Sequence, residues 1–177
     1  MNMLTGCAAL GFVVGQCLLC GCQGTSATTT PADQATALEQ TRCTGDIDEA
    51  AVARVLDGST VERVDPAYNG SASKGGNPRL HGAAILVRPS RGETAEWLAR
   101  ALECHGAQQL HAYATGAAAK ADPFWLPESV VQIAVASSRD EFRIEVTSDS
   151  SDQAREILAR AQALPHAHSP TAALESR

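Results

Sequence analysis

One stretch near the C-terminus decides the fold, and it reads Val131-Gln-Ile-Ala-Val-Ala-Ser-Ser-Arg-Asp-Glu-Phe-Arg-Ile-Glu-Val146. Large apolar residues occupy every second position in both of its halves, which is the period of a strand with one buried face. Between the halves, Ser137–Asp140 supplies residues that favour a turn. The stretch therefore predicts a β-hairpin.

The segments that flank this hairpin predict one further strand and two helices. Upstream, Gly82–Arg88 is a short apolar run typical of a buried strand, and Glu93–His105 has apolar residues at helical spacing. Downstream, Ser150 and Gln153 predict a capping box at the start of a final helix. The apolar face of that helix is formed by Ala154, Ile157, Leu158, Ala161 and Leu164.

A turn is predicted at Asp122–Pro127, where Phe124, Trp125 and Leu126 are expected to close one end of the core. The helix at 93–105 is predicted to form a crossover connection between two strands. Because such crossovers are right-handed, the strand at 83–88 is expected to pair with the strand that follows this helix.

The N-terminal part of the domain adds a helix and a weak strand. Apolar residues at helical spacing begin at Ile47 and end at Leu56, and Gly58 provides a helix stop. The segment Thr60–Val64 alternates and predicts a short strand, whereas residues 65–79 read as a loop. This order predicts an α+β fold, a small βαββα sheet of ferredoxin-like flavour with helices packed on one face, preceded by an extra N-terminal helix.

Length and charge exclude two classes of protein. The chain has 177 residues, with 14 Lys and Arg against 20 Asp and Glu, and a net charge of −6. An acidic chain without a Lys/Arg cluster argues against a general nucleic-acid binder. After the N-terminus there is no apolar segment long enough to span a bilayer, which excludes a polytopic membrane protein.

The N-terminus has the pattern of an export signal. Residues 1–21 contain no Asp, Glu, Lys or Arg, and the apolar run Leu10–Leu19 is shorter than the about 20 residues that a spanning helix needs. A short apolar region followed by small residues predicts a secretory signal peptide. The tetrapeptide Leu19-Cys20-Gly21-Cys22 resembles a bacterial lipobox, which implies lipidation of Cys22, and Gln23 favours outer-membrane delivery. A buried apolar helix and an ordinary cleaved signal are the alternatives.

These patterns divide the chain into four regions. We expect a lipoprotein signal peptide at 1–21, a flexible tether at 22–42, an α+β domain at 43–164 and a disordered tail at 165–177. The tether and the tail are assigned because they contain too few large apolar residues to offset the entropy of an ordered chain.

The cysteines predict a disulfide. Three of the six would leave with the signal and Cys22 would be lipidated, so Cys43 and Cys104 remain in the mature chain. An even pair in an oxidising compartment favours a bond between them, which would close a loop of roughly 60 residues and contribute about 4 kcal/mol. The alternative is a pair of buried free thiols.

Cys104 and His105 also suggest a metal site. On a helical wheel both project from the same broad face, and a soft metal ion could take them as ligands together with His81 or His111. The usual ligand spacings are absent, and a Cys104 bonded to Cys43 could not be a ligand. The alternative is a partly buried His105 with an ordinary hydrogen-bond partner.

No sequence motif predicts catalysis. Ser71-Ala-Ser-Lys74 has the spacing of a penicillin-binding motif, but it lies in a glycine-rich loop without the Lys-Thr-Gly partner. Signatures of serine hydrolases and zinc proteases are missing. We therefore expect a protein that is not an enzyme and needs no cofactor. A small hydrolase would require a polar cleft with a paired base and nucleophile.

The core resembles uncharacterised small lipoproteins of unknown function from GC-rich Gram-negative bacteria. The resemblance is carried by Gly82–Pro89, Trp97–His105, Asp122–Pro127 and Ala154–Gln162. It implies a location and no activity.

The expected function is an outer-membrane-anchored periplasmic lipoprotein that contacts the membrane through its lipid. Its domain would be a non-catalytic binding or envelope-interaction module of unknown ligand or partner, with no role in nucleic-acid binding. The alternative is a periplasmic metal-handling protein that uses Cys104, His105 and a nearby histidine.

Overall fold

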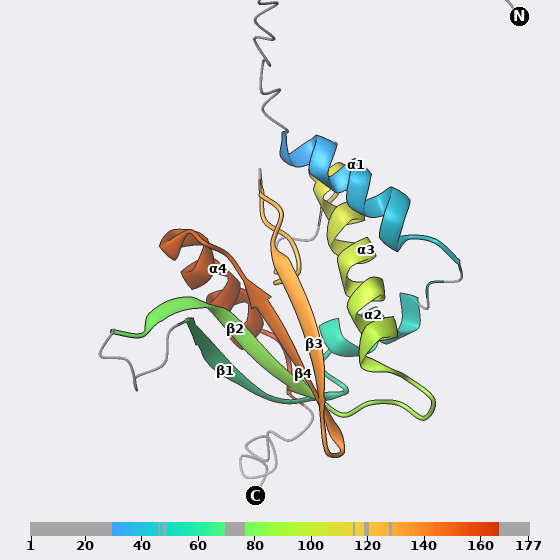
Figure 1. The fold of residues 1–177 in the computed structure, drawn as a ribbon, viewed down its shortest axis with the longest axis vertical. Helices are drawn as coiled ribbons and strands as arrows, with labels where there is room; N and C mark the ends of the chain where they lie inside the picture. The colour runs from blue at the N-terminus through green and yellow to red at the C-terminus, as the bar shows by residue number, and fades with distance from the viewer. Residues whose placement is uncertain are drawn as a thin grey trace, which may run out of the picture.

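The structure is a computed structural model that describes residues 30–45, 47, 49–69, 77–114, 116–118, 121–127 and 129–166. Within these ranges the chain forms helices and strands in an α+β arrangement, which confirms the predicted fold class (Figure 1). In chain order the elements are α1 (Pro31–Arg42), α2 (Glu49–Leu56), β1 (Val61–Asn69), β2 (Arg79–Val87), α3 (Ala95–Ala114), β3 (Gln132–Ser138), β4 (Glu141–Thr147) and α4 (Ser151–Gln162).

The strands form one antiparallel sheet in the order β1-β2-β4-β3. The hairpin predicted from the alternating stretch is present, with Ile133 opposite Val146 and Val135 opposite Ile144. Its two-residue turn contains Arg139 at a φ of 53°, a left-handed conformation that tight hairpin turns favour. The register places the large apolar residues of both strands on one face of the sheet.

The order of the strands corrects one expectation. β2 does not pair with β3, the strand that follows α3, because β4 lies between them. The side chains explain the exchange, since the apolar residues of β4 are almost fully buried and those of β3 are only partly buried. β2 and β3 therefore run parallel on either side of β4, as in a split β-α-β unit. The order is not the simple ferredoxin-like one, because the strand beside β2 precedes it in the chain instead of following α4.

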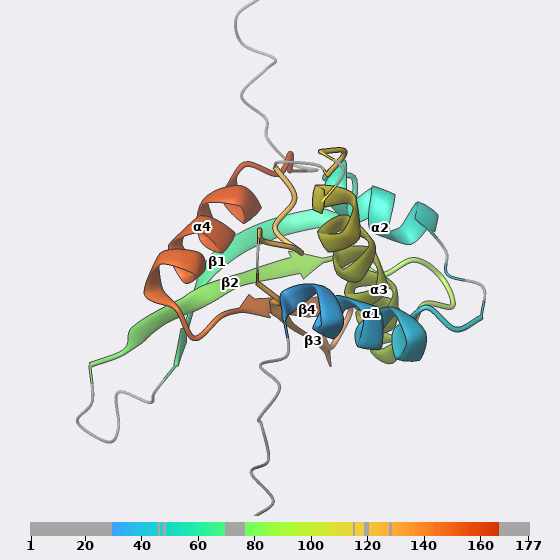
Figure 2. The ribbon, with the colours of Figure 1, turned by 90° about the horizontal axis from the view of Figure 1, so that it is seen from above.

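The core lies between the sheet and the helices. Ile85 of β2 and Ile144 of β4 pack against Leu102 of α3 and Ile157 of α4, and each of these side chains is fully buried. The predicted closure of the core by the turn at 122–127 is also present, because Phe124 is fully buried in the core. The segment that carries this turn lies between α3 and α4 (Figure 2).

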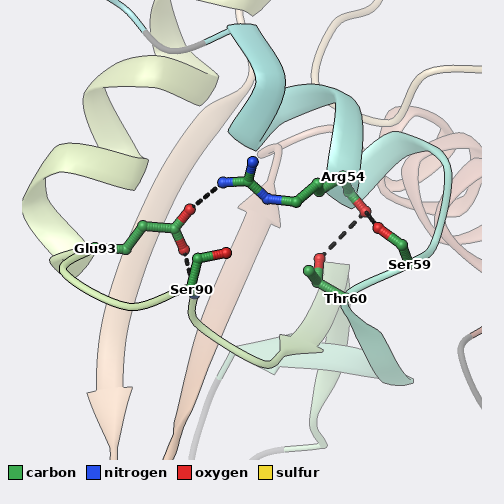
Figure 3. A network of polar contacts seen from close by, with 5 residues as sticks. All are labelled: Arg54, Ser59, Thr60, Ser90 and Glu93. Carbon is green, nitrogen blue, oxygen red and sulfur yellow. Dashed lines mark hydrogen bonds and ion pairs between the residues drawn. The ribbon is translucent and has the colours of Figure 1, made fainter.

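A network of polar contacts joins α2 to the segment before α3 (Figure 3). The guanidinium of Arg54 pairs with the carboxylate of Glu93, which also accepts a hydrogen bond from the backbone N–H of Ser90 at 2.7 Å. The carbonyl oxygen of Arg54 accepts hydrogen bonds from the hydroxyls of Ser59 and Thr60, each at 3.2 Å. The C-terminal end of α2 is thereby fixed at the edge of the core.

Two elements extend beyond their predicted ends. β1 continues to Asn69, where a loop is expected from the sequence, because pairing with β2 persists across two register shifts. Pro66 is tolerated there because β1 has a free edge. α3 continues past His105 to Ala114, because its additional turns bury Ala107 and Leu110 against α1.

The prediction of a flexible tether at 22–42 is wrong for Pro31–Arg42, which form α1. The helix begins with a capping box, in which the Thr30 hydroxyl accepts from the backbone N–H of Asp33 at 3.2 Å and the Asp33 carboxylate accepts from that of Thr30 at 3.0 Å. Docking on α3 buries Ala35 completely. The predicted signal peptide, Cys22 and residues 23–29 of the tether lie outside the described residues.

The capping box predicted at Ser150 is not formed. Ser150 is the N-cap of α4, but its side chain makes no capping hydrogen bond. The Gln153 side chain instead accepts hydrogen bonds from the hydroxyls of Ser148 at 2.6 Å and Ser129 at 3.2 Å. Gln153 therefore connects α4 to the segment that leads into β3. Of the predicted tail, Pro165 and His166 are described, and residues 167–177 lie outside the description.

Candidate functional site

A pocket of about 240 Å³ lies between α1, α3 and the segment that leads into β3. Most of its lining is apolar, with Leu38 from α1, Leu110 from α3, and Val130 and Ile133 from the segment that includes the start of β3. We call this space the α1–α3 pocket. It is larger than the apolar cavities of about 150 Å³ that accommodate benzene in other proteins.

Small residues create the space. Ala35 on α1 and Gly106 and Ala107 on α3 all line the pocket, and none of them has a side chain that could fill it. Gly106 has a second role, because a Cβ atom at that position would lie 2.5 Å from the carbonyl oxygen of Phe124. The glycine thus allows the turn at 122–127 to pack directly on α3 and form the floor of the pocket.

Among the described residues that line the pocket, Glu103 is the one that is ionisable. Its side chain is 18% exposed, and its Oε2 atom lies 2.8 Å from Nε of Arg42 on α1. The contact is an ion pair without hydrogen-bond alignment, since Oε2 accepts no hydrogen bond from the described residues. Burial raises the pKa of the Glu103 carboxyl above its ordinary value, and the Arg42 charge opposes that rise.

A disulfide and polar contacts hold α1 against α3. The predicted bond between Cys43 and Cys104 is present, with Cα atoms 5.1 Å apart. Further along the helices, His111 lies between two residues of α1, with Nδ1 3.0 Å from the Glu39 carboxylate and Nε2 3.2 Å from the Thr36 hydroxyl. These contacts attach α1 to α3 from Thr36 in its middle to Cys43 at its C-terminal end.

The floor of the pocket is held by a buried carboxylate. Asp122, which is 2% exposed, lies 2.6 Å from Nε2 of His105 and accepts a hydrogen bond from the backbone N–H of Phe124 at 2.8 Å. From the other side, Arg160 of α4 donates hydrogen bonds to the carbonyl oxygens of Asp122 at 3.2 Å and Trp125 at 3.0 Å. Burial of a carboxylate requires such partners, and these fix the turn to both helices.

The residues considered for a metal site serve other contacts. Cys104 is bonded to Cys43, His105 pairs with Asp122, and His111 pairs with Glu39. His81 lies apart from them on β2. In the described part of the chain, no three His, Cys, Asp or Glu side chains gather in a way that could hold a metal ion. The structure does not bring the four proposed ligands together.

The pair of His105 and Asp122 has the arrangement of a general base with an orienting carboxylate. His105 also lines a groove between α2 and α3, together with Glu49 and Gln108. Among the described residues that line this groove there is no serine, threonine or cysteine. The contacts of the pair position the turn at 122–127 on α3.

Sequence reasoning did not identify Glu103 or Asp122 as site residues. A weak sequence feature could have identified each of these two residues. Glu103 falls within an otherwise small and apolar helical face, and Asp122 stands directly before a proline in an apolar turn. A charged residue in either setting needs a partner, and the partners come from α1 and α3, whose contact the sequence did not predict.

No protein-family model, curated protein or solved structure matches this chain. The resemblance to small bacterial lipoproteins stays a prediction. Among the described helices, none is both long and apolar enough to cross a membrane.

Proposed function

We propose that this protein is an outer-membrane-anchored periplasmic lipoprotein whose domain is a non-catalytic binding module, with the α1–α3 pocket as its ligand site. The pocket is the observation that carries the proposal. The lipobox at Leu19–Cys22 supports the anchor, and the disulfide between Cys43 and Cys104 fits an oxidising compartment.

The lining of the pocket supports a small apolar ligand. Ligand sites are typically concave and mostly apolar, with a few polar groups that orient the ligand. Here the apolar walls come from Leu38, Leu110 and Ile133, and one carboxylate lies among them. A volume of about 240 Å³ suits a molecule with one ring or a short aliphatic chain.

Binding of a simple apolar probe tests the ligand site. Toluene is added to the full chain in lipid nanodiscs, and the methyl resonances of Leu38, Leu110 and Val130 are followed by NMR. We expect saturable shifts of these methyl groups. Val130→Trp should abolish them by filling the pocket, whereas the matched variant Ala134→Trp, on an exposed position of β3, should leave them unchanged. Absence of saturable shifts in the unmodified chain would contradict the proposed site.

Metabolic labelling tests the anchor. Cells that express the full chain are grown with labelled palmitate, and the label is expected on the protein. A Cys22→Ala variant should lose the label, because the lipobox cysteine is the proposed acceptor. A labelled Cys22→Ala product, or no label on the unmodified chain, would rule out lipidation at this residue.

A further inference from the structure

The α1–α3 pocket points to a chemical class of ligand. Building on the proposed function, we infer that the pocket binds a small apolar amine, whose ammonium group pairs with Glu103 while its apolar part lies between Leu38 and Leu110.

The geometry of Glu103 supports an ammonium partner. Glu103 lines the pocket, its side chain is 18% exposed, and its buried Oε2 atom accepts no hydrogen bond from the described residues. An ionised carboxylate can accept about four hydrogen bonds, so the single contact with Arg42 leaves acceptor sites open. An ammonium group carries three donors and would supply charge-assisted hydrogen bonds, which are stronger than neutral ones.

The other polar groups of the lining do not favour an acid or a neutral polar ligand. The Ser129 hydroxyl already donates to Gln153, and Gln132 lies in an exposed position. A ligand carboxylate would meet the negative charge of Glu103 in a partly buried site, where repulsion is stronger than in water. An uncharged ligand could gain a hydrogen bond to Glu103 but would lack the attraction between opposite charges.

Arg42 provides a second test, because its guanidinium competes with the ammonium group of the ligand for the Glu103 carboxylate. Its side chain is 44% exposed, so the guanidinium can move toward solvent when an ammonium group enters. Removal of Arg42 should therefore strengthen amine binding, whereas removal of the Glu103 charge should weaken it. If Arg42 and Glu103 only stabilised the fold, their removal would not change amine binding in opposite directions.

The experiment compares three probes of similar shape, toluene, benzylamine and benzoate, on the full chain in nanodiscs. We expect benzylamine to bind more tightly than toluene, and benzoate to bind least. Glu103→Gln should weaken benzylamine binding about tenfold and leave toluene binding unchanged. Arg42→Gln should strengthen benzylamine binding. Glu96→Gln, at an exposed position of the same helix, is the matched control and should change neither probe.

The outcomes separate the inference from the proposed function. If no probe binds the unmodified chain, the proposed ligand site fails and the amine inference with it. If toluene binds but benzylamine has no advantage, or keeps its advantage in Glu103→Gln, the amine inference alone is overturned. Equal weakening of toluene and benzylamine by Glu103→Gln would also overturn it, since that result reports a general loss of the pocket.

Discussion

Two carboxylates lie inside the same part of the molecule, and their surroundings differ. Asp122 has a partner for each oxygen, His105 for one and the backbone N–H of Phe124 for the other. Glu103 has an ion pair with Arg42 and no aligned hydrogen bond among the described residues. The first arrangement stabilises a turn, and the second leaves a buried acceptor beside a pocket, which is typical of a functional group.

The role of Asp122 predicts a large loss of stability when the residue is replaced. Asp122→Ala leaves His105 and the backbone N–H of Phe124 without their partner inside the protein, so we expect the free energy of unfolding to fall by about 3 kcal/mol. Chemical denaturation followed by circular dichroism measures the loss. Asp140→Ala, in the exposed hairpin turn, is the control and should change stability by less than about 0.5 kcal/mol. Similar losses for both variants would contradict the role of Asp122.

Glu103 predicts that the stability of the folded protein depends on pH. Because burial raises the pKa of its carboxyl in the folded protein, the folded state holds the proton at pH values where the unfolded chain has released it. The contribution of Glu103 to stability therefore falls as pH rises from the ordinary glutamate pKa of 4.5 through the raised value. Glu103→Gln should remove this part of the pH profile and be more stable than the unmodified chain at neutral pH.

Thermal denaturation across a pH series measures this difference. The two proteins should converge at acidic pH, below 4.5, where Glu103 is protonated in both the folded and the unfolded state. A constant difference in melting temperature at every pH would show that the effect does not come from titration of Glu103. Glu103→Gln would then bind the amine less tightly and be more stable. Replacement of a functional group commonly raises stability at the cost of function in this way.

At the scale of elements, α1 depends on its neighbours. Among the side chains of α1 that the structure describes, Ala35 alone is buried, and partly buried Leu38 packs beside it. An isolated helix of this length is marginal in water, so its order comes from docking on α3 and from the disulfide at its C-terminal end. α1 is thus the element of the pocket wall that is most sensitive to redox conditions.

Loss of the disulfide should weaken both the fold and the pocket. For a bond that joins residues 61 positions apart, the chain-entropy relation gives a loss of about 4 kcal/mol in the free energy of unfolding. Denaturation of the chain with and without reductant measures it, and titration of free thiols in the unreduced, unfolded chain should find none at Cys43 and Cys104. Titration of two thiols there would show that the bond is not formed.

The N-cap of α1 provides a milder perturbation. Thr30→Ala removes the hydroxyl that accepts from the backbone N–H of Asp33, and such substitutions cost about 1 kcal/mol. Because α1 is held separately by its disulfide, we expect faster amide hydrogen exchange in α1 and little change in the sheet. Thr60→Ala, whose hydroxyl is bonded to Arg54 instead, should leave exchange in α1 unaffected. Uniformly faster exchange across the domain would contradict the expectation that α1 opens separately from the sheet.

The elements that could be predicted from the sequence are those with a strong local period. The hairpin, β2, α2 and α4 each carry an apolar pattern that fits one structure. α1 and the second half of α3 were not predicted, because each is poor in large apolar residues and is stabilised by the other. The candidate site was missed for the same reason, since the pocket and the surroundings of Glu103 arise only when these two helices meet.

At the scale of the whole molecule, the two faces of the sheet have different surroundings. One face packs against α3 and α4, and on the other face β4 carries the charged residues Glu141, Arg143 and Glu145. Charged side chains pair along single strands of the sheet, Arg143 with Glu145 on β4 and Arg63 with Asp65 on β1. The pocket lies away from this charged face, among the helices and the edge strand β3, so a ligand could enter without separating the core.

Ligand binding should accordingly stabilise the molecule as a whole. A probe that binds only the folded state at a free concentration of 100 times its Kd adds about 2.7 kcal/mol to the free energy of unfolding. Benzylamine should raise the melting temperature of the unmodified chain, and Val130→Trp should remove the effect. The same rise in Val130→Trp would place the probe elsewhere on the protein.

The position of the disulfide has a mechanical consequence for a domain tethered at its N-terminus. Tension applied from that end would travel along α1 to Cys43, cross the sulfur bridge to Cys104 and continue toward the C-terminus. The intervening loop, which contains α2, β1 and β2, would stand outside the path of the load. The bridge would shield β1 and β2 from a pull at the N-terminus, and among the described helices α1 alone would carry that load before the bridge.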